Sequence, residues 1–262
     1  MEVVIVPGPD QAGALVGGAV AELVDRRPTA VLGLATGSSP LAVYRDLARR
    51  HRAGELSLAA ARAFLLDEYV GLPDRHPQAY RSFIARELER DVDFAPGAVR
   101  GPAVRVDGPA LLQACADYET AIAAAGGVDL QLLGIGTDGH IGFNEPGSSL
   151  ASRTRIKTLT DQTRADNARF FTSTDEVPRH VVTQGVGTIL EARHLVLLAF
   201  GHAKAGAVAR AVEGPVTAMV PGSALQLHPH ATVVVDEAAA SELSLAGYYR
   251  ETWASKPSWQ GL

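Results

Sequence analysis

Six short apolar runs rich in β-branched residues recur along the 262-residue chain, and they restrict its fold more than any other feature of the sequence. Each run is almost continuously apolar, whereas a strand with one face in water alternates apolar and polar residues. The runs cover residues 3–6, 30–35, 63–66, 128–135, 195–200 and 232–235. Helical patterns lie between them, at residues 10–26, 40–52, 80–90, 108–125, 161–171, 179–192 and 202–213. This alternation predicts an α/β fold with three layers, in which helices cover both faces of a doubly wound, mostly parallel sheet.

The chain contains no stretch that resembles a linker between domains. Proline and glycine are most frequent at residues 71–77 and 95–102, and both stretches are as short as turns. Internal repeats and low-complexity tracts are absent, so we expect one domain over residues 1–262. The polar tail at residues 254–262 could dock on the body of the chain or on a neighbouring subunit, and the sequence leaves both open.

Charge and cysteine content limit the classes of function. The formal net charge is −5 and the basic residues are scattered, which argues against a nucleic-acid partner. A single cysteine, Cys115, excludes an intrachain disulfide and a multi-cysteine zinc site, and it favours a reducing cytoplasm. No apolar run reaches membrane-spanning length, and the first residues lack the basic region of a signal peptide. We therefore expect a cytoplasmic protein with no membrane partner.

The most reactive side chains are concentrated in residues 134–146, directly after an apolar run. Asp138, His140 and Glu145 share this stretch with four glycines, at positions 134, 136, 139 and 142. Two carboxylates and an imidazole can divide acid and base roles near neutral pH, and a loop after a parallel strand faces the usual ligand edge of the sheet. Each residue alone fits a turn or a packing role, but together they favour a catalytic site.

Residues 36–39 precede a helical pattern and could bind a phosphate group. Thr36, Ser38 and Ser39 are donors, Gly37 permits close approach, and a helix N-terminus attracts anions. The alternative is an N-cap turn, with one serine as the cap and Pro40 as the first helical residue. Lys204, which follows the run at 195–200, is a second candidate for a phosphate contact.

Two adjacent carboxylates, Asp67 and Glu68, follow the apolar run at residues 63–66. Neighbouring side chains on an extended segment point to opposite sides. One of the two is therefore expected to face a site, while the other caps or pairs, and the residue pattern alone leaves open which is which.

Two other chemistries are not favoured. Asp138 and His140 are of metal-ligand type, but no companion histidine pair has helical spacing, and the motif at 228–230, His-Pro-His, suits a turn. A serine hydrolase would carry a Gly-x-Ser-x-Gly elbow, and the turn at 36–40 lacks both that pattern and the lysine of a nucleotide-binding P-loop. We expect neither a metal nor a cofactor.

Three long motifs resemble the glucosamine-6-phosphate deaminase family. They lie at residues 65–73 (LLDEYVGLP), 136–146 (GTDGHIGFNEP) and 148–157 (SSLASRTRIK). Shorter supporting matches follow the family's order at residues 36–40, 167–171, 185–189, 212–214 and 225–229, so that the resemblance covers nearly the whole chain. Departures from the family pattern at Ser39, often threonine, and Gly142, often alanine, are mild.

The resemblance implies a modified doubly wound fold and a cofactor-free aldose–ketose isomerisation with deamination. Glucosamine 6-phosphate and water would give fructose 6-phosphate and ammonium. In this family the residue matching Asp67 is the base that moves a proton between C2 and C1 through an enolamine, which makes Glu68 its structural neighbour. The residue matching His140 opens the sugar ring, and those matching Asp138 and Glu145 tune and orient it.

The resemblance also implies a phosphate site and a regulatory site. Phosphate would contact residues 36–39, Arg169 and Lys204, with Arg169 in a mobile lid over residues 155–180. Some family members are hexamers activated by N-acetylglucosamine 6-phosphate, and residues of that activator site match Ser148, Arg155 and Lys157. A solvated strand face is an equal explanation of Arg155 and Lys157, because exposed charge by itself reveals little. Residues 248–250 do not align with the C-terminal tyrosine of the regulated enzymes, and homo-oligomerisation stays open.

Two alternative functions are compatible with these features. A 6-phosphogluconolactonase-type hydrolase resembles this fold and uses a histidine loop, but it does not need Asp67 as a carbon base. A sugar-phosphate sensor would bind without turnover, and the chain lacks the helix-turn-helix extension or basic face of a regulator that binds DNA.

Overall fold

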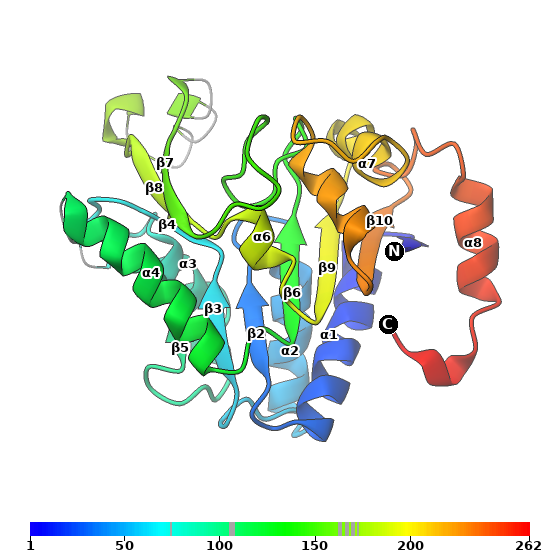
Figure 1. The fold of residues 1–262 in the computed structure, drawn as a ribbon. Coiled ribbons are helices and arrows are strands. Elements are labelled where there is room, and N and C mark those ends of the chain that lie inside the picture. The colour runs from blue at the N-terminus through cyan, green and yellow to red at the C-terminus, as the bar shows by residue number, and fades with distance from the viewer. Residues whose placement is uncertain (74, 105–107, 162–163, 166–167, 169–170, 172) are drawn as a thin grey trace.

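Seven parallel strands form the central sheet of the computed structural model (Figure 1). The structure describes residues 1–73, 75–104, 108–161, 164, 165, 168, 171 and 173–262. In spatial order the strands are β1 (Glu2–Val6), β10 (Ala231–Asp236), β9 (His194–Ala199), β6 (Leu130–Gly134), β2 (Val31–Leu34), β3 (Arg62–Leu65) and β5 (Val99–Arg100). All six predicted strands are confirmed, and most of their residues are buried, as expected for strands covered on both faces. β5 was not predicted, because two residues give no readable pattern.

Helices cover both faces of this sheet (Figure 1). On one face α1 (Pro9–Arg26) packs against α2 (Leu41–Arg52) so closely that a Cβ on Gly13 would lie 2.5 Å from the Ala42 carbonyl oxygen. On the other face lie α4 (Pro109–Ala124) and the short α6 (Val186–Ile189). The remaining helices are α3 (Tyr80–Glu87), α7 (Ala205–Val212), α8 (Ala246–Ala254) and the 3-10 turns Glu89–Asp91, Thr174–Glu176, His202–Lys204, Pro221–Leu227 and Ser258–Gln260. The three-layer prediction is confirmed; the predicted helix at 161–171 lies largely outside the described residues.

A second, antiparallel sheet of three strands was not predicted. It contains β4 (Asp67–Tyr69), β8 (His180–Thr183) and β7 (Arg155–Thr158), in that spatial order with β8 in the middle. The prediction of one helix over 179–192 is therefore wrong. The β-branched residues of β8 pair with β4 and β7, and β4 lies far from β8 in the sequence. Gly185 lies between the end of β8 and the single-turn helix α6.

The order of the main sheet places a switch point between β2 and β6. From β2 the chain proceeds outward through β3 to β5, and it then returns to the opposite side of β2 as β6, β9 and β10. Loops that leave the carboxyl ends of β2 and β6 therefore diverge from one crevice, which is where open α/β sheets bind ligands.

The C-terminal tail docks on the body of its own chain. α8 packs beside β1, and Lys256 Nζ lies 2.6 Å from Glu2 Oε2. Leu262 packs against the main apolar core. No helix in the described part of the chain is both long and apolar enough to cross a membrane.

Candidate active site at the switch point

Three segments leave the carboxyl edge of the sheet next to one another. They are residues 35–40 after β2, the β3–β4 junction at 65–67, and residues 135–146 after β6, which we call the histidine loop. Leu66 N donates to the Leu34 carbonyl at 3.2 Å, which joins the junction to β2. Ser39 lies against Gly134, since a Cβ on that glycine would be 3.7 Å from Ser39 Oγ. The three sequence motifs therefore meet in space.

The two adjacent carboxylates have different surroundings. Glu68 accepts hydrogen bonds from three backbone N–H groups, those of Tyr69, Tyr80 and Arg81, at 2.8–2.9 Å. Tyr80 and Arg81 are the first residues of α3, so Glu68 caps that helix. The Asp67 side chain has no hydrogen bond or ion pair within the described ranges, although the residue is only 5% exposed. This resolves which carboxylate has a capping role and leaves Asp67 available for chemistry.

Burial without a partner makes Asp67 a weak acid. Its pKa is raised from 3.8 to about 8, first by desolvation and then by the negative charge of Glu68. A carboxyl group with a pKa near the working pH can both accept and return a proton, as a general base needs to do.

The histidine loop holds its imidazole against a carboxylate. His140 Nδ1 lies 2.7 Å from Asp138 Oδ1, and the same oxygen accepts the backbone N–H of His140 at 3.1 Å. The hydrogen bond between the two side chains is the first cause that lowers the pKa of Asp138, to about 2. Both side chains are partly exposed, at 35% for His140 and 45% for Asp138. The imidazole is thus oriented, with its second ring nitrogen free of this contact.

Two glycines of the loop are required by close approach. A Cβ on Gly136 would lie 2.2 Å from His140 Cε1, so any side chain there would displace the imidazole. Gly139 has a φ of +95°, and a Cβ would lie 2.6 Å from Val220 Cγ1. The segment that contains Val220 also supplies the Gly222 N–H, which donates to the Gly139 carbonyl at 2.8 Å.

Gly142 is the point at which the histidine loop touches the base. A Cβ built on Gly142 would lie 3.5 Å from Asp67 Oδ2 and 3.1 Å from Thr183 Oγ1. Thr183 is the residue of β8 that pairs with Asp67 across the small sheet. Residue 67 and the loop that carries His140 therefore adjoin one another, as a shared site requires.

The other predicted residues are distributed around this point. Glu145 is half-buried near the end of the histidine loop, and its carbonyl accepts the Ser148 N–H at 3.0 Å. Residues 36–39 form an irregular turn in which Gly37 has a φ of +86°, and the N-cap of α2 is Pro40, with no side-chain cap. The alternative N-cap role for Ser38 or Ser39 is therefore wrong. Lys204 is half-buried at the same sheet edge, after β9, while Arg169 lies outside the described residues.

The three residues predicted for activator binding lie after the histidine loop, and Arg155 pairs with Thr183 on the side of β8 opposite to Asp67. Arg155 and Lys157 are half-buried on β7, and burial lowers the pKa of Arg155. Arg155 also lines a cavity of about 410 Å³ beside α4, together with Leu112 and Cys115. Ser148 is buried, and its Oγ has no hydrogen-bond partner within the described part of the chain.

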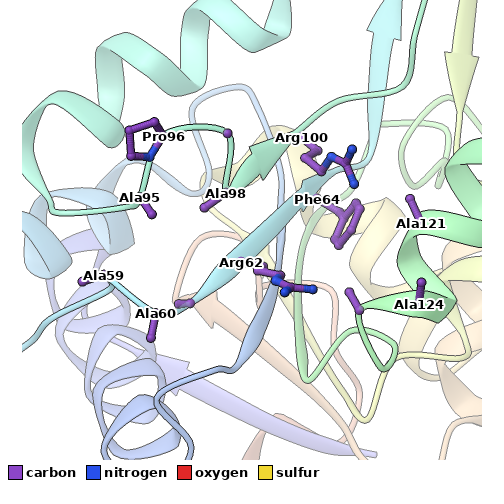
Figure 2. Close-up of a pocket in the computed structure, with 13 residues that line it drawn as sticks. Ala59, Ala60, Arg62, Phe64, Ala95, Pro96, Ala98, Arg100, Ala121 and Ala124 are labelled. Atoms are coloured by element: carbon purple, nitrogen blue, oxygen red, sulfur yellow. The ribbon is translucent and has the colours of Figure 1, made fainter.

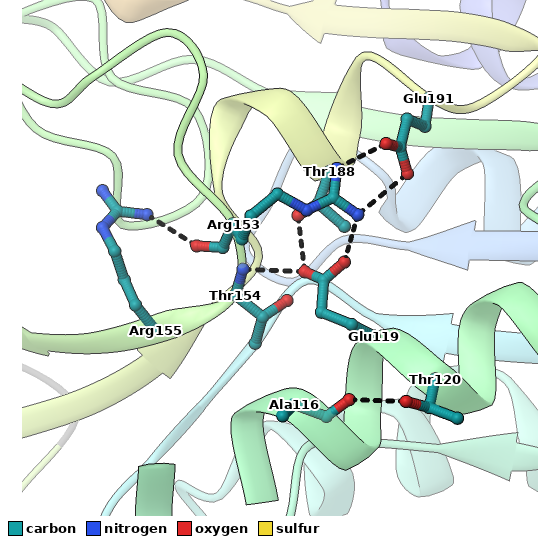
Figure 3. Close-up of polar contacts among 8 residues, drawn as sticks. All are labelled: Ala116, Glu119, Thr120, Arg153, Thr154, Arg155, Thr188 and Glu191. Atoms are coloured by element: carbon teal, nitrogen blue, oxygen red, sulfur yellow. Dashed lines mark hydrogen bonds and ion pairs between the residues drawn. The ribbon is translucent and has the colours of Figure 1, made fainter. Parts of the chain in front are cut away.

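A polar cluster centred on Glu119 attaches the start of β7 to α4 and α6. Glu119 accepts hydrogen bonds from Thr154 N at 2.7 Å and Thr188 Oγ1 at 2.6 Å, and it pairs with Arg153 (Figure 3). Figure 3 shows Arg155 extending away from Glu119, held by a bond to the Arg153 carbonyl. α4, β7 and α6 are thereby joined at one point.

A cavity of about 440 Å³ lies away from the candidate site. It lies between the start of β3, β5 and the end of α4, with Arg62, Phe64 and Arg100 projecting beside small residues (Figure 2). None of the predicted site residues lines it. We assign the site by the convergence of titratable groups rather than by cavity size.

Sequence reasoning missed the residues that hold the Asp67 junction and the histidine loop together. Thr183 and Gln184 contact both the Asp67 junction and the histidine loop, and Tyr118 Oη donates to the Leu65 carbonyl at 2.7 Å. All three lie 40 or more positions from at least one of their partners. No local pattern could have identified them, because their contacts exist only after the two sheets form.

Comparison with known proteins agrees with this geometry. A family model described as glucosamine-6-phosphate isomerases/6-phosphogluconolactonase matches residues 10–235. Proteins named glucosamine-6-phosphate deaminase from Beutenbergia cavernae and Mycolicibacterium smegmatis are 64% and 62% identical to the chain, with 100% of both chains covered in each case.

Solved structures give the same result for the fold. A structure reported as a monomeric glucosamine-6-phosphate deaminase of the NagB superfamily is 40% identical, with a TM-score of 0.88 over 92% of this chain and 100% of its own. The 6-phosphogluconolactonase of Trypanosoma cruzi is 20% identical, with a TM-score of 0.73 over 93% and 97%, which is a likeness of fold alone. The chain therefore belongs to the family of glucosamine-6-phosphate isomerases and 6-phosphogluconolactonases, and within it groups with the members named glucosamine-6-phosphate deaminase.

Proposed function

We propose that this protein converts glucosamine 6-phosphate and water to fructose 6-phosphate and ammonium. The observation that carries the proposal is the close approach at Gly142, which sets the loop of the paired His140 beside Asp67, a buried carboxyl group with no hydrogen bond or ion pair among the described residues. A ring-opening imidazole and a carbon base next to one another are what an isomerisation of a cyclic amino-sugar requires.

The reaction begins with opening of the ring. His140 moves a proton from the anomeric hydroxyl to the ring oxygen, and the C1–O5 bond breaks to leave an aldehyde. Asp138 holds the imidazole by its Nδ1, so that the other nitrogen faces the sugar. Glu145, near the end of the same loop, helps to orient His140.

Asp67 then carries out the isomerisation. Its carboxylate takes the proton from C2 while the aldehyde oxygen gains a proton from the substrate's own ammonium group, which gives an enolamine with a C1–C2 double bond and a hydroxyl on C1. Asp67 then returns the C2 proton to C1. Because Asp67 is buried, most of the protons that it takes are returned to carbon, and only a part exchanges with solvent. Water then adds to the resulting C2 imine and the C–N bond breaks. Ammonium is released, and C2 becomes the ketone carbon of fructose 6-phosphate.

The phosphate group is proposed to bind at residues 36–39, Lys204 and Arg169. Backbone donors, an ammonium and a guanidinium suit a dianion, and binding there would fix C1 and C2 beside Asp67. Arg169 belongs to the lid proposed over residues 155–180, whose closure would protect the enolamine from solvent. Activation by N-acetylglucosamine 6-phosphate at Ser148, Arg155 and Lys157, assembly into oligomers and a cytoplasmic location stay as predictions.

An ammonium-release assay tests the function directly. The protein should release ammonium and fructose 6-phosphate in equal amounts from glucosamine 6-phosphate without added metal or cofactor. Addition of N-acetylglucosamine 6-phosphate in a parallel reaction tests regulation. Hydrolysis of 6-phosphogluconolactone with no ammonium release would replace the proposal with a lactonase, and binding of the amino-sugar phosphate without product would replace it with a sensor.

A further inference from the structure

Gln184 is a buried residue at which two segments of the candidate site meet. It follows β8, is 1% exposed and uses its backbone and its side chain together. Its N–H donates to the Leu66 carbonyl at 2.8 Å, and its Nε2 donates to the Leu65 carbonyl at 3.0 Å. Its own carbonyl accepts Asn144 Nδ2 at 2.9 Å. One residue therefore contacts both the junction before Asp67 and the histidine loop.

Asn144 carries the connection into the histidine loop. It is fully buried, and its Nδ2 also donates to the Ile141 carbonyl at 2.9 Å, one residue after His140. On the other side, the residue directly after Leu66 is Asp67. The path from the carboxyl group to the imidazole therefore runs through Gln184 and Asn144 by hydrogen bonds of 2.8–3.0 Å.

Thr183 provides a parallel connection of the same kind. It pairs with Asp67 across β4 and β8, and its Oγ1 accepts the Phe143 N–H at 3.2 Å. The same hydroxyl donates to the Gln184 carbonyl at 3.2 Å. The loop is thus attached at two consecutive residues to the end of β8, the strand that pairs with Asp67, which restricts rotation as well as translation.

These bonds are not all needed to satisfy buried polar atoms. The Leu65 carbonyl already accepts the Tyr118 hydroxyl at 2.7 Å, so the Gln184 side chain adds a second donor to an occupied acceptor. Asn144 Oδ1 is buried without a hydrogen-bond partner in the described ranges, an arrangement that costs stability. A group kept at such a cost calls for a role other than stability.

We propose that Gln184 is a positioning residue, whose side-chain amide holds the Asp67 junction against the end of β8, where Asn144 also attaches the histidine loop, and so keeps the Asp67 carboxyl and the His140 imidazole at a fixed separation. The inference rests on the proposed function, because it concerns how two groups act on one sugar. Its physical basis is that a displacement of about 1 Å at a reacting centre can cost about 100-fold in rate.

Gln184→Met tests the proposal with little change of volume. The variant keeps both backbone hydrogen bonds and leaves Tyr118 on the Leu65 carbonyl, so it should fold. We expect kcat on glucosamine 6-phosphate to fall about 10- to 100-fold while KM stays within about twofold, since substrate binding does not depend on this separation. The acid limb of kcat/KM should move to lower pH, because a looser junction admits water to Asp67, whose pKa is raised mainly by burial.

Gln131→Met is the matched control. Gln131 is also fully buried, and its Nε2 donates a single hydrogen bond to a backbone carbonyl, that of Leu132, at 2.9 Å. It lies inside β6, away from the junction. Its replacement should lower the melting temperature about as much as Gln184→Met does, but leave kcat and the pH profile unchanged.

The possible results separate the inference from the proposed function. Wild-type kcat and pH profile in Gln184→Met would overturn the positioning role alone, as would an equal loss of kcat in Gln131→Met. If Gln184→Met does not fold, Thr183→Val applies the same criteria to the second connection, and an unchanged kcat there overturns the proposal. Absence of ammonium release by the wild-type protein would overturn both the function and the inference that rests on it.

Discussion

The start of β4 and the histidine loop each present one aspartate to the candidate site, in opposite surroundings. Asp67 is buried and unpaired within the described residues, and its pKa is raised to about 8. Asp138 is 45% exposed and bonded to His140, and its pKa is lowered to about 2. The same side chain thus becomes a proton acceptor in one place and a permanent anion in the other, because desolvation dominates at position 67 and a hydrogen bond dominates at position 138.

The largest effect is expected from Asp67→Asn. The amide keeps the size of the side chain but cannot take a proton from C2, so turnover should fall by about 10³- to 10⁴-fold, within the range of a lost general base. Exchange of the C2 proton with deuterium from solvent, followed by NMR, should cease while the sugar phosphate still binds. Continued exchange at the wild-type rate would assign the base to another residue and remove the contrast between the two aspartates.

The same substitution should change how stability depends on pH. The folded-state pKa of Asp67 is raised from 3.8 to about 8, so the folded state binds this proton more tightly than the unfolded state. Wild-type stability should therefore fall as pH rises from about 4 to about 8, by up to about 5 kcal/mol from this group. Asp138 has the opposite sign, and its contribution is lost only as pH falls from 3.8 towards about 2.

Urea unfolding at several pH values measures this difference. Asp67→Asn should equal the wild type near pH 4 and exceed it in stability near pH 8. Glu68, whose pKa is also raised by burial, is present in both proteins, so the difference between the two curves isolates position 67. Parallel curves would show that Asp67 is ionised in the folded protein throughout this range.

His140→Gln tests the contribution of the histidine loop to turnover. The amide can still occupy the site near Asp138 but cannot move a proton to the ring oxygen, so turnover of the cyclic sugar should fall about 100-fold. An analogue locked in the open-chain form should lose much less. Equal losses on the two substrates, measured as kcat/KM, would deny His140 a special part in ring opening.

The smallest effects are expected from two alanine substitutions in the histidine loop. Gly136→Ala places a methyl group where the His140 ring lies and should reduce turnover about 10-fold or more by turning the imidazole away from Asp138. Gly142→Ala meets no atom closer than 3.1 Å and should cost about 1 kcal/mol of stability, for a φ of +55°, with little loss of rate. Comparable kinetics in the two variants would show that the imidazole does not need its observed place.

The sequence predicted the parts of this molecule whose signals are local. Continuous apolar runs predicted six strands, and the glycine-rich stretch at 134–146 predicted the loop that holds His140. The antiparallel sheet was missed because β8 is a strand only by virtue of β4 and β7, which lie far from it in the chain. For the same reason Asp67 and Glu68 could be distinguished only when α3 was seen to take the second carboxylate.

The place of β1 in the sheet bears on how the protein is made. Among the described strands β1 pairs with β10 alone, residue Glu2 opposite Thr232, and α8 and the last residues pack over it. During translation β1 leaves the ribosome more than 200 residues before β10, its neighbour in the sheet, is synthesised. β1 therefore stays bound to a chaperone or in transient contact with α1 until synthesis is nearly finished. Completion of the sheet is a late, long-range and correspondingly slow event.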